Sequence, residues 1–302
     1  RCFLWESVSG DIVKQRLFVS STFLPDQSML IDALDVCSRL SVDGVELGSN
    51  HCFEGKYPYL KKFDFAYLVH NFFPIPPESY VVNVASLDED IRKKSIAHVK
   101  ASIDFTGDIG AELYTFHPGF LTDPASAGRT ETNFDFCFEK LPRTEFFEMA
   151  ENHFYRSLDE IIAYATANDV EIAVETEGSV RHCQQLLMQT PDDFDLFRSR
   201  YGPHDIGINL NVGHMYLASK VFLFDVEVQV NSIKEYLVAM ELSHNDGVED
   251  SHLPLVRGAW YWPLIMDQDY RHLPKILEFR EVSEKQLREN VLLFRQIENE
   301  QE

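Results

Sequence analysis

The sequence has few cysteines, and none of them are paired by spacing. Its five cysteines, Cys2, Cys37, Cys52, Cys137 and Cys183, are odd in number, lie far apart and include no C-x-x-C motif. Disulfide frameworks are typical of much smaller secreted chains, and a thiolate zinc site needs closely spaced cysteines. We therefore expect free thiols and a cytoplasmic protein.

Long hydrophobic runs and basic clusters are also missing. No apolar run approaches the roughly 18 residues that a membrane-spanning helix needs, and no secretory signal is visible. The 302 residues include 49 acidic and 27 basic ones, a net charge of −22. Because nucleic-acid binding draws most of its affinity from Lys and Arg contacts to phosphates, nucleic acid is disfavoured as a partner and a small-molecule substrate is expected.

The sequence does contain a repeated alternation of short apolar β-rich runs and amphipathic stretches. Strands are predicted at 17–23, 44–49, 65–72, 112–117, 170–176, 205–211, 237–244 and 274–279, and helices at about 28–41, 88–110, 145–168 and 283–299. Alternating strands and helices imply parallel β-α-β units, and eight strands close a (β/α)8 or TIM barrel of the α/β class. We expect one domain over 1–302, with an N-terminal extension at 1–16 and a lid-like insertion at 119–144 after the fourth strand.

Histidines and carboxylates stand at or just after the ends of the third to eighth predicted strands. They are His70, His117, Glu175, His214, His244, Asp250, His252 and Glu278. Imidazole and carboxylate are the usual ligands of zinc and related divalent ions. Since the loops after barrel strands meet at the C-terminal face, the pattern predicts one metal site there.

Each of these residues also has a structural interpretation when taken alone. His117, followed by Pro and Gly, is when taken alone more typical of a core or capping histidine than of a metal ligand. Glu175 ends an apolar strand, where a carboxylate is costly unless it binds a metal or forms a salt bridge. Glu278 has Arg280 two residues on, so a Glu–Arg pair is the alternative there. The Asp250–His252 loop is the densest cluster and favours a functional role.

In the order and spacing of these motifs, the chain resembles the xylose isomerase-like TIM-barrel superfamily over about residues 17–299. It is most similar to the AP endonuclease family 2, or endonuclease IV-like, branch. The resemblance implies a trinuclear zinc site built from His70, His117, Glu175, Asn211 with His214, His244, Asp250 with His252, and Glu278. The sugar isomerases and epimerases of the superfamily resemble a four-ligand subset, Glu175, position 211, His244 and Glu278, which binds one metal.

The chain departs from the family pattern at one ligand. The aspartate expected after the sixth strand is Asn211, which can offer only a neutral carbonyl oxygen. This change predicts weaker metal binding there, or a different metal or occupancy. The acidic composition, and the lack of evident equivalents of the DNA-intercalating loops, disfavour DNA repair.

The first functional hypothesis is a metal-dependent hydrolase of a small phosphoester or related small molecule. Two or three ions about 3.5–4 Å apart can generate hydroxide and clamp the leaving oxygen. Glu175 would bridge metals, His214 with Asp250 and His252 would hold one ion, and His70 with His117 would hold another. We expect up to three divalent ions, zinc before manganese or iron, with Glu175, Glu278 and His214 as catalytic candidates.

The second hypothesis is a metal-dependent sugar or sugar-phosphate isomerase or epimerase. Glu175 and Glu278 would flank the substrate as an acid/base pair while one metal polarises its carbonyl and hydroxyl. Further alternatives are an iron-dependent redox enzyme, a DNA endonuclease, and a non-enzyme whose metal site has decayed with Asn211 as the first loss.

Overall fold

The structure, a computed structural model, describes residues 14–123, 144–178 and 186–301. Eight parallel strands close into a barrel in chain order, with the last strand paired to the first. They are β1 (Leu17–Ser20), β2 (Gly44–Leu47), β3 (Ala66–His70), β4 (Tyr114–Phe116), β5 (Ile172–Glu175), β6 (Gly207–Asn211), β7 (Leu237–Leu242) and β8 (Lys275–Leu277). The predicted (β/α)8 barrel is confirmed.

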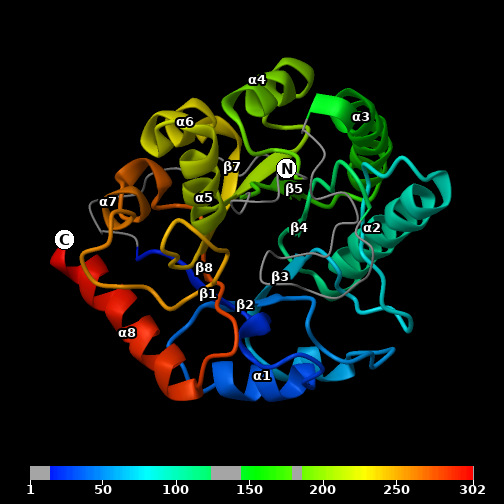
Figure 1. The fold of residues 1–302 in the computed structure, drawn as a ribbon. Helices are drawn as coiled ribbons and strands as arrows, with labels where there is room; N and C mark the ends of the chain where they lie inside the picture. The colour runs from blue at the N-terminus through cyan, green and yellow to red at the C-terminus, as the bar shows by residue number, and fades with distance from the viewer. Residues whose placement is uncertain (1–13, 124–143, 179–185, 302) are drawn as a thin grey trace.

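The helices surround the strands (Figure 1). They are α1 (Leu30–Cys37), α2 (Glu89–Ile109), α3 (Thr144–Ala167), α4 (Pro191–Arg200), α5 (Val212–Phe222), α6 (Val226–Ser232), α7 (Trp262–Ile265) and α8 (Glu284–Glu300). The predictions at 88–110, 145–168 and 283–299 match α2, α3 and α8 to within one residue at each end. The predicted helix at 28–41 is too long, and α4 to α7 were not predicted.

The strands are shorter than predicted, and after β1 side-chain hydrogen bonds take the place of strand pairing. The run at 17–23 is a strand only to Ser20, and Ser21–Phe23 forms a 3-10 turn. The Ser21 hydroxyl accepts from Gly48 N at 2.8 Å and lies 2.8 Å from His51 Nε2. These contacts bend the chain outward at the barrel mouth.

Inside the barrel, an apolar layer lies beneath a polar one. Phe18, Leu68, Leu113, Ala173, Ala239 and Ile276 form a separate buried cluster. Side chains two residues apart on a strand point to the same face. Two residues further along come Ser20, His70, Thr115, Glu175, Glu241 and Glu278, all buried. The polar side chains therefore form a layer next to the apolar cluster, on its side toward the C-terminal ends of the strands.

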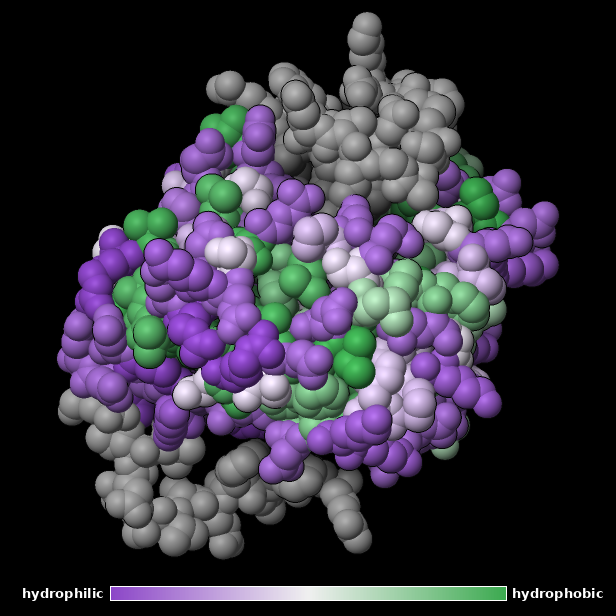
Figure 2. Space-filling view, turned by 90° about the horizontal axis from the view of Figure 1, so that it is seen from below, coloured by the Kyte–Doolittle hydropathy of each residue, from purple (hydrophilic) through white to green (hydrophobic). Residues whose placement is uncertain are grey.

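The surface is mostly hydrophilic, as the charge predicts. Figure 2 shows hydrophilic residues over most of one face, with smaller hydrophobic areas between them. None of the helices in the described ranges combines the length and apolar character needed to cross a bilayer. Cys37 and Cys52 are free thiols, as predicted. Nearly all of the 1–16 extension and of the 119–144 insertion lies outside the described residues.

Candidate metal centre

The strand ends place the predicted ligands at one mouth of the barrel. His70 ends β3, Glu175 ends β5 and Asn211 ends β6, while His117 and Glu278 follow β4 and β8 by one residue. Parallel strands in a barrel point their carboxyl ends the same way, so these side chains gather at the C-terminal face. The convergence that a single metal site requires is therefore present.

A first cluster consists of His70, His117 and Glu175, whose ligand atoms lie within 4.8 Å of one another. His70 Nε2 and His117 Nδ1 each lie 3.5 Å from Glu175 Oε2. Thr115 Oγ1 lies 2.8 Å from His70 Nδ1 and fixes that ring. His117 Nδ1 also lies 2.6 Å from Glu177 Oε1. Two imidazoles and one carboxylate are a donor set typical of catalytic zinc with an open position.

A second cluster consists of His214, Asp250 and His252, again within 4.8 Å. Asp250 Oδ1 lies 3.3 Å from His214 Nε2 and 2.9 Å from His252 Nε2. Arg280 Nη2 donates to Asp250 Oδ2 at 3.1 Å. In the part of the chain that the structure describes, Arg280 thus pairs with Asp250, and not with Glu278 as the alternative interpretation of the sequence had it.

Glu175 connects the two clusters. Its Oε2 faces His70 and His117, whereas its Oε1 lies 3.1 Å from His214 Nδ1. The other nitrogen of the His214 ring faces Asp250. Glu175 therefore belongs to the first cluster directly and reaches the second through the His214 ring, whose Nδ1 also lies 3.0 Å from Thr176 O.

Asn211 lies at the centre of three carboxylates. Its Nδ2 donates to Glu175 Oε1, Glu241 Oε2 and Glu278 Oε2, each at 3.0 Å. Its Oδ1 accepts from His214 N at 3.1 Å, which caps α5 and fixes which end of the amide faces the carboxylates. A neutral donor therefore stands where the family resemblance implies an anionic ligand.

Sequence reasoning missed two glutamates of this centre, Glu46 in β2 and Glu241 in β7. Both are fully buried, and with His70 they form a third group of ligand atoms within 4.8 Å. A signal for them exists in the sequence, because each is a carboxylate inside a short apolar strand. The same argument identifies Glu175 and Glu278.

His244 lies outside these three groups. Its backbone pairs with Leu253 at 2.8 and 2.9 Å, and its ring packs edge-on to Tyr261 with centroids 5.9 Å apart. It stands three residues after Glu241, so the two-residue strand period does not bring it to the face that Glu241 occupies. A ligand role for His244 stays a prediction.

Burial and neighbouring charges divide the carboxylates into two kinds. Burial, followed by the charge of Glu278, raises the pKa of Glu46 to about 8. Burial, followed by the charge of Glu175, raises the pKa of Glu241 well above its usual range. Burial also opposes ionisation of Glu278, but the facing His252 outweighs it and lowers the pKa to about 2.

The histidines of the centre also divide into two kinds, and burial lowers the pKa of His70 to about 4. Burial would lower the pKa of His117, but the charges of Glu175 and Glu177 outweigh it and raise that pKa to about 9. Burial is likewise outweighed at His214, where Asp250 holds the pKa well above its usual value. Without a bound cation, protons on His117 and His214 would offset the negative charge of the nearby carboxylates. Metal binding would release these protons.

The donor atoms fit a group of divalent ions. Both Glu46 oxygens and Glu175 Oε2 are buried without a hydrogen-bond partner among the described residues. An unpaired buried polar atom costs free energy, more so when it carries charge. Carboxylate and imidazole atoms in this state are suited to bind a cation.

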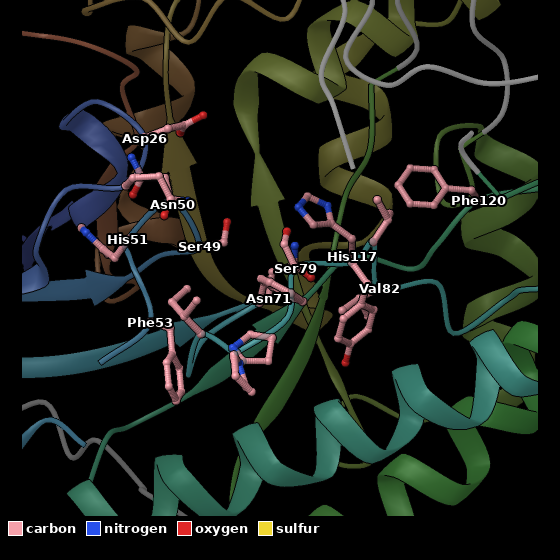
Figure 3. A pocket seen from close by; sticks show the side chains of 17 residues that line it. Asp26, Ser49, Asn50, His51, Phe53, Asn71, Ser79, Val82, His117 and Phe120 are labelled. Carbon is pink, nitrogen blue, oxygen red and sulfur yellow. The ribbon is translucent and has the colours of Figure 1, made fainter. Parts of the chain in front are cut away.

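A pocket of about 510 Å³ opens beside the first cluster. His117 and Asn71 lie on one side of it and Asp26, Asn50 and His51 on the other (Figure 3). Asn50 Oδ1 and Asn71 Oδ1 are buried without hydrogen-bond partners in the described residues. Neither lysine nor arginine occurs among the described residues that line the pocket. Its exposed polar groups come from residues such as Asp26 and Ser79, and it also offers aromatic surface to a small molecule.

Known structures share this fold at low sequence identity. A D-tagatose 3-epimerase-like protein aligns with a TM-score of 0.71 at 17% identity, over 95% of this chain and 99% of its own. Endonuclease IV from Thermus thermophilus aligns with a TM-score of 0.63 at 14% identity, over 94% of this chain and 99% of its own. At these identities the likeness shows the fold alone.

Sequence comparison leads to one family. The uncharacterized protein MJ1614 of Methanocaldococcus jannaschii is 24% identical over 243 residues, which is 79% of this chain and 81% of that protein. The family described as the xylose isomerase-like TIM barrel matches residues 36–297. This match spans most of the chain, and the protein belongs to the xylose isomerase-like TIM-barrel family.

Proposed function

We propose that the protein is a metal-dependent hydrolase of a small phosphoester or related small molecule, with a divalent ion in each of the first two clusters. The observation that carries this proposal is the pair of neighbouring clusters, with Glu175 in the first and in contact with the His214 ring of the second. When bound, a pair of such ions would polarise a phosphoryl oxygen and make water more acidic. Zinc fits the imidazole-rich clusters best.

The surrounding residues would position the ligands and the substrate. Glu177 accepts from the His117 ring and would orient it, and Arg280 would do the same for Asp250. His117 lines the pocket, so the substrate would approach the centre from that side. Exposed polar side chains of the lining, such as Asp26 and Ser79, would contact its polar groups. Glu175, Glu278 and His214 remain the catalytic candidates.

Metal stoichiometry and hydrolysis test the proposal together. Protein loaded with zinc and freed of excess metal should hold two ions per chain and hydrolyse bis(para-nitrophenyl) phosphate. Glu175→Gln should lose zinc and reduce turnover by roughly 100-fold. Glu171→Gln is a matched control, because Glu171 is exposed just before the same strand and should change neither quantity. One ion or none in the wild type would contradict the proposal.

A sugar isomerase or epimerase is the second candidate, favoured by the pocket. The lack of lysine and arginine among its described lining residues suits an uncharged substrate better than a phosphate. Glu175 and Glu278 both contact Asn211 and would flank a substrate as the acid/base pair. Interconversion of ketohexoses by protein holding a single ion, with uptake of solvent deuterium at carbon, would select this alternative.

A further inference from the structure

Glu46 and Glu241 are buried carboxylates that lie outside the two proposed metal clusters. They come from β2 and β7, and both are 0% exposed. Their oxygens and a ring nitrogen of His70 lie within 4.8 Å of one another. The strands β2, β3 and β7 thus direct an acidic ligand set into the barrel.

This set lacks a cationic side chain. Among the described residues, no lysine or arginine forms an ion pair with either glutamate. Glu241 accepts from Asn209 Nδ2 at 2.6 Å and from Asn211 Nδ2 at 3.0 Å, and its Oε1 lies 3.6 Å from His70 Nδ1. Both oxygens of Glu46 have no hydrogen-bond partner at all in the described residues. Two facing buried carboxylates must share a proton or hold a cation.

We propose that Glu46, His70 and Glu241 hold a further divalent cation, at a position different from the one that the Asn211 amide fills. The inference rests on the proposed function only in placing zinc in the first two clusters. Asn211 keeps its hydrogen bonds to Glu175 and Glu278 in this arrangement.

The donor chemistry sets the kind of ion. The two His-rich clusters suit zinc, whereas a pair of carboxylates with one imidazole suits a harder ion such as manganese. His70 is shared, because its Nε2 faces Glu175 while its Nδ1 lies 2.8 Å from Thr115 Oγ1 and 3.6 Å from Glu241 Oε1, so an ion at Nδ1 would displace the Thr115 contact. A neutral imidazole offers one lone pair, so the further ion competes with the first cluster for this ring. It should therefore bind last and most weakly.

The test uses the full chain and Mn²⁺ as the probe. Protein is first loaded with zinc and its zinc content measured, and Mn²⁺ is then titrated while free Mn²⁺ is followed by electron paramagnetic resonance. The wild type should bind one Mn²⁺ per chain and keep the zinc of the second cluster, which does not share His70. Glu46→Gln should keep its zinc and its fold by circular dichroism, but bind Mn²⁺ at least about tenfold more weakly.

Two controls separate the possible causes. Glu171→Gln should bind Mn²⁺ like the wild type, because Glu171 is exposed at the far end of β5. Asp250→Asn should lose zinc from the second cluster and still bind Mn²⁺. If the zinc-loaded wild type takes up no Mn²⁺, or if Glu46→Gln binds it equally well, the two glutamates share a proton and the inference is wrong. Loss of zinc binding in the wild type would instead defeat the proposed function.

Discussion

Asn211 is the residue that decides how the buried carboxylates are held. Its amide donates to three of them while its oxygen caps α5. In Asn211→Asp, a fourth carboxylate would replace the shared donor. We expect the metal-free variant to lose about 3 kcal/mol or more of stability, as when one partner of a buried charge pair is removed.

Divalent metal should reverse this loss, because the new carboxylate completes a ligand set with Glu175, Glu241 and Glu278. The measurement is the urea midpoint of Asn211→Asp with EDTA and with zinc. Asn211→Ala is the control, since it loses the same donor without gaining a ligand. Equal responses of the two variants to zinc would contradict the expectation.

His117 should make the metal-free protein sensitive to pH. Its pKa is about 9 in the folded chain, against the ordinary 6.5, so folding favours the protonated ring. The resulting stabilisation is complete below the unfolded pKa and is lost as the pH rises through the folded one. With EDTA present, the wild type should therefore lose stability between pH 6.5 and pH 9.

His117→Gln isolates this contribution from that of the neighbouring glutamates. The difference in urea midpoint between wild type and variant should shrink toward alkaline pH. A difference that stays constant over the range would mean that the ring is neutral in the folded protein.

At the scale of single residues, the sequence predicted that histidines and carboxylates meet at one mouth of the barrel. It did not show for every strand which side chains point inward. His70, His117, Glu175, Asp250 and His252 fall in the clusters as expected. Glu46 and Glu241 were missed because a short apolar strand does not by itself reveal which face points into the barrel. Which side chains of β7 point into the barrel became clear only from the structure, where Ala239 lies in the apolar layer inside it, two residues before Glu241.

At the scale of elements, the long helices were predicted because their apolar spacing and caps are clear in the sequence. The short helices have too few residues to show such a pattern. α2 (Glu89–Ile109) is capped at its start by Asp88, whose side chain accepts from Asp90 N and Ile91 N. At its end it is capped by Gly110 in the left-handed region at φ 69°. α5, in contrast, begins inside the N-x-x-H motif. The spacing of Asn211 and His214 that suggested metal ligands is also that of a helix cap.

The cap of α2 gives an element-scale prediction. Asp88→Ala removes the acceptor for two backbone N–H groups and should destabilise the protein by about 1 kcal/mol. Asp90→Ala, in the exposed first turn of the same helix, should cost clearly less. Urea unfolding followed by circular dichroism measures both. Because α2 packs outside the barrel, metal content should be unchanged, and a loss of zinc in Asp88→Ala would show that the helix supports the centre.

At the scale of the whole molecule, negative charge accumulates in two places that respond differently to solvent. The chain carries a net charge of −22, most of it on the surface, while the carboxylates of the centre are buried inside the barrel. Dissolved salt screens exposed charges over about 8–10 Å but reaches buried ones poorly. Bound divalent ions act on the buried group directly, and each stabilises the folded state by mass action.

Chelation and salt should therefore have separable effects on melting. Removing metal with EDTA should lower the Tm by about 5 °C or more, as expected for the loss of a few kcal/mol in a domain of this size. Adding 0.5 M NaCl (roughly a 4 Å screening length) to the chelated protein should recover only part of that loss, because the buried carboxylates stay unscreened. Glu175→Gln should respond to salt but scarcely to EDTA, since a ligand of the first cluster is gone. Full recovery by salt alone would show that surface repulsion, and not the barrel centre, limits the stability of the metal-free chain.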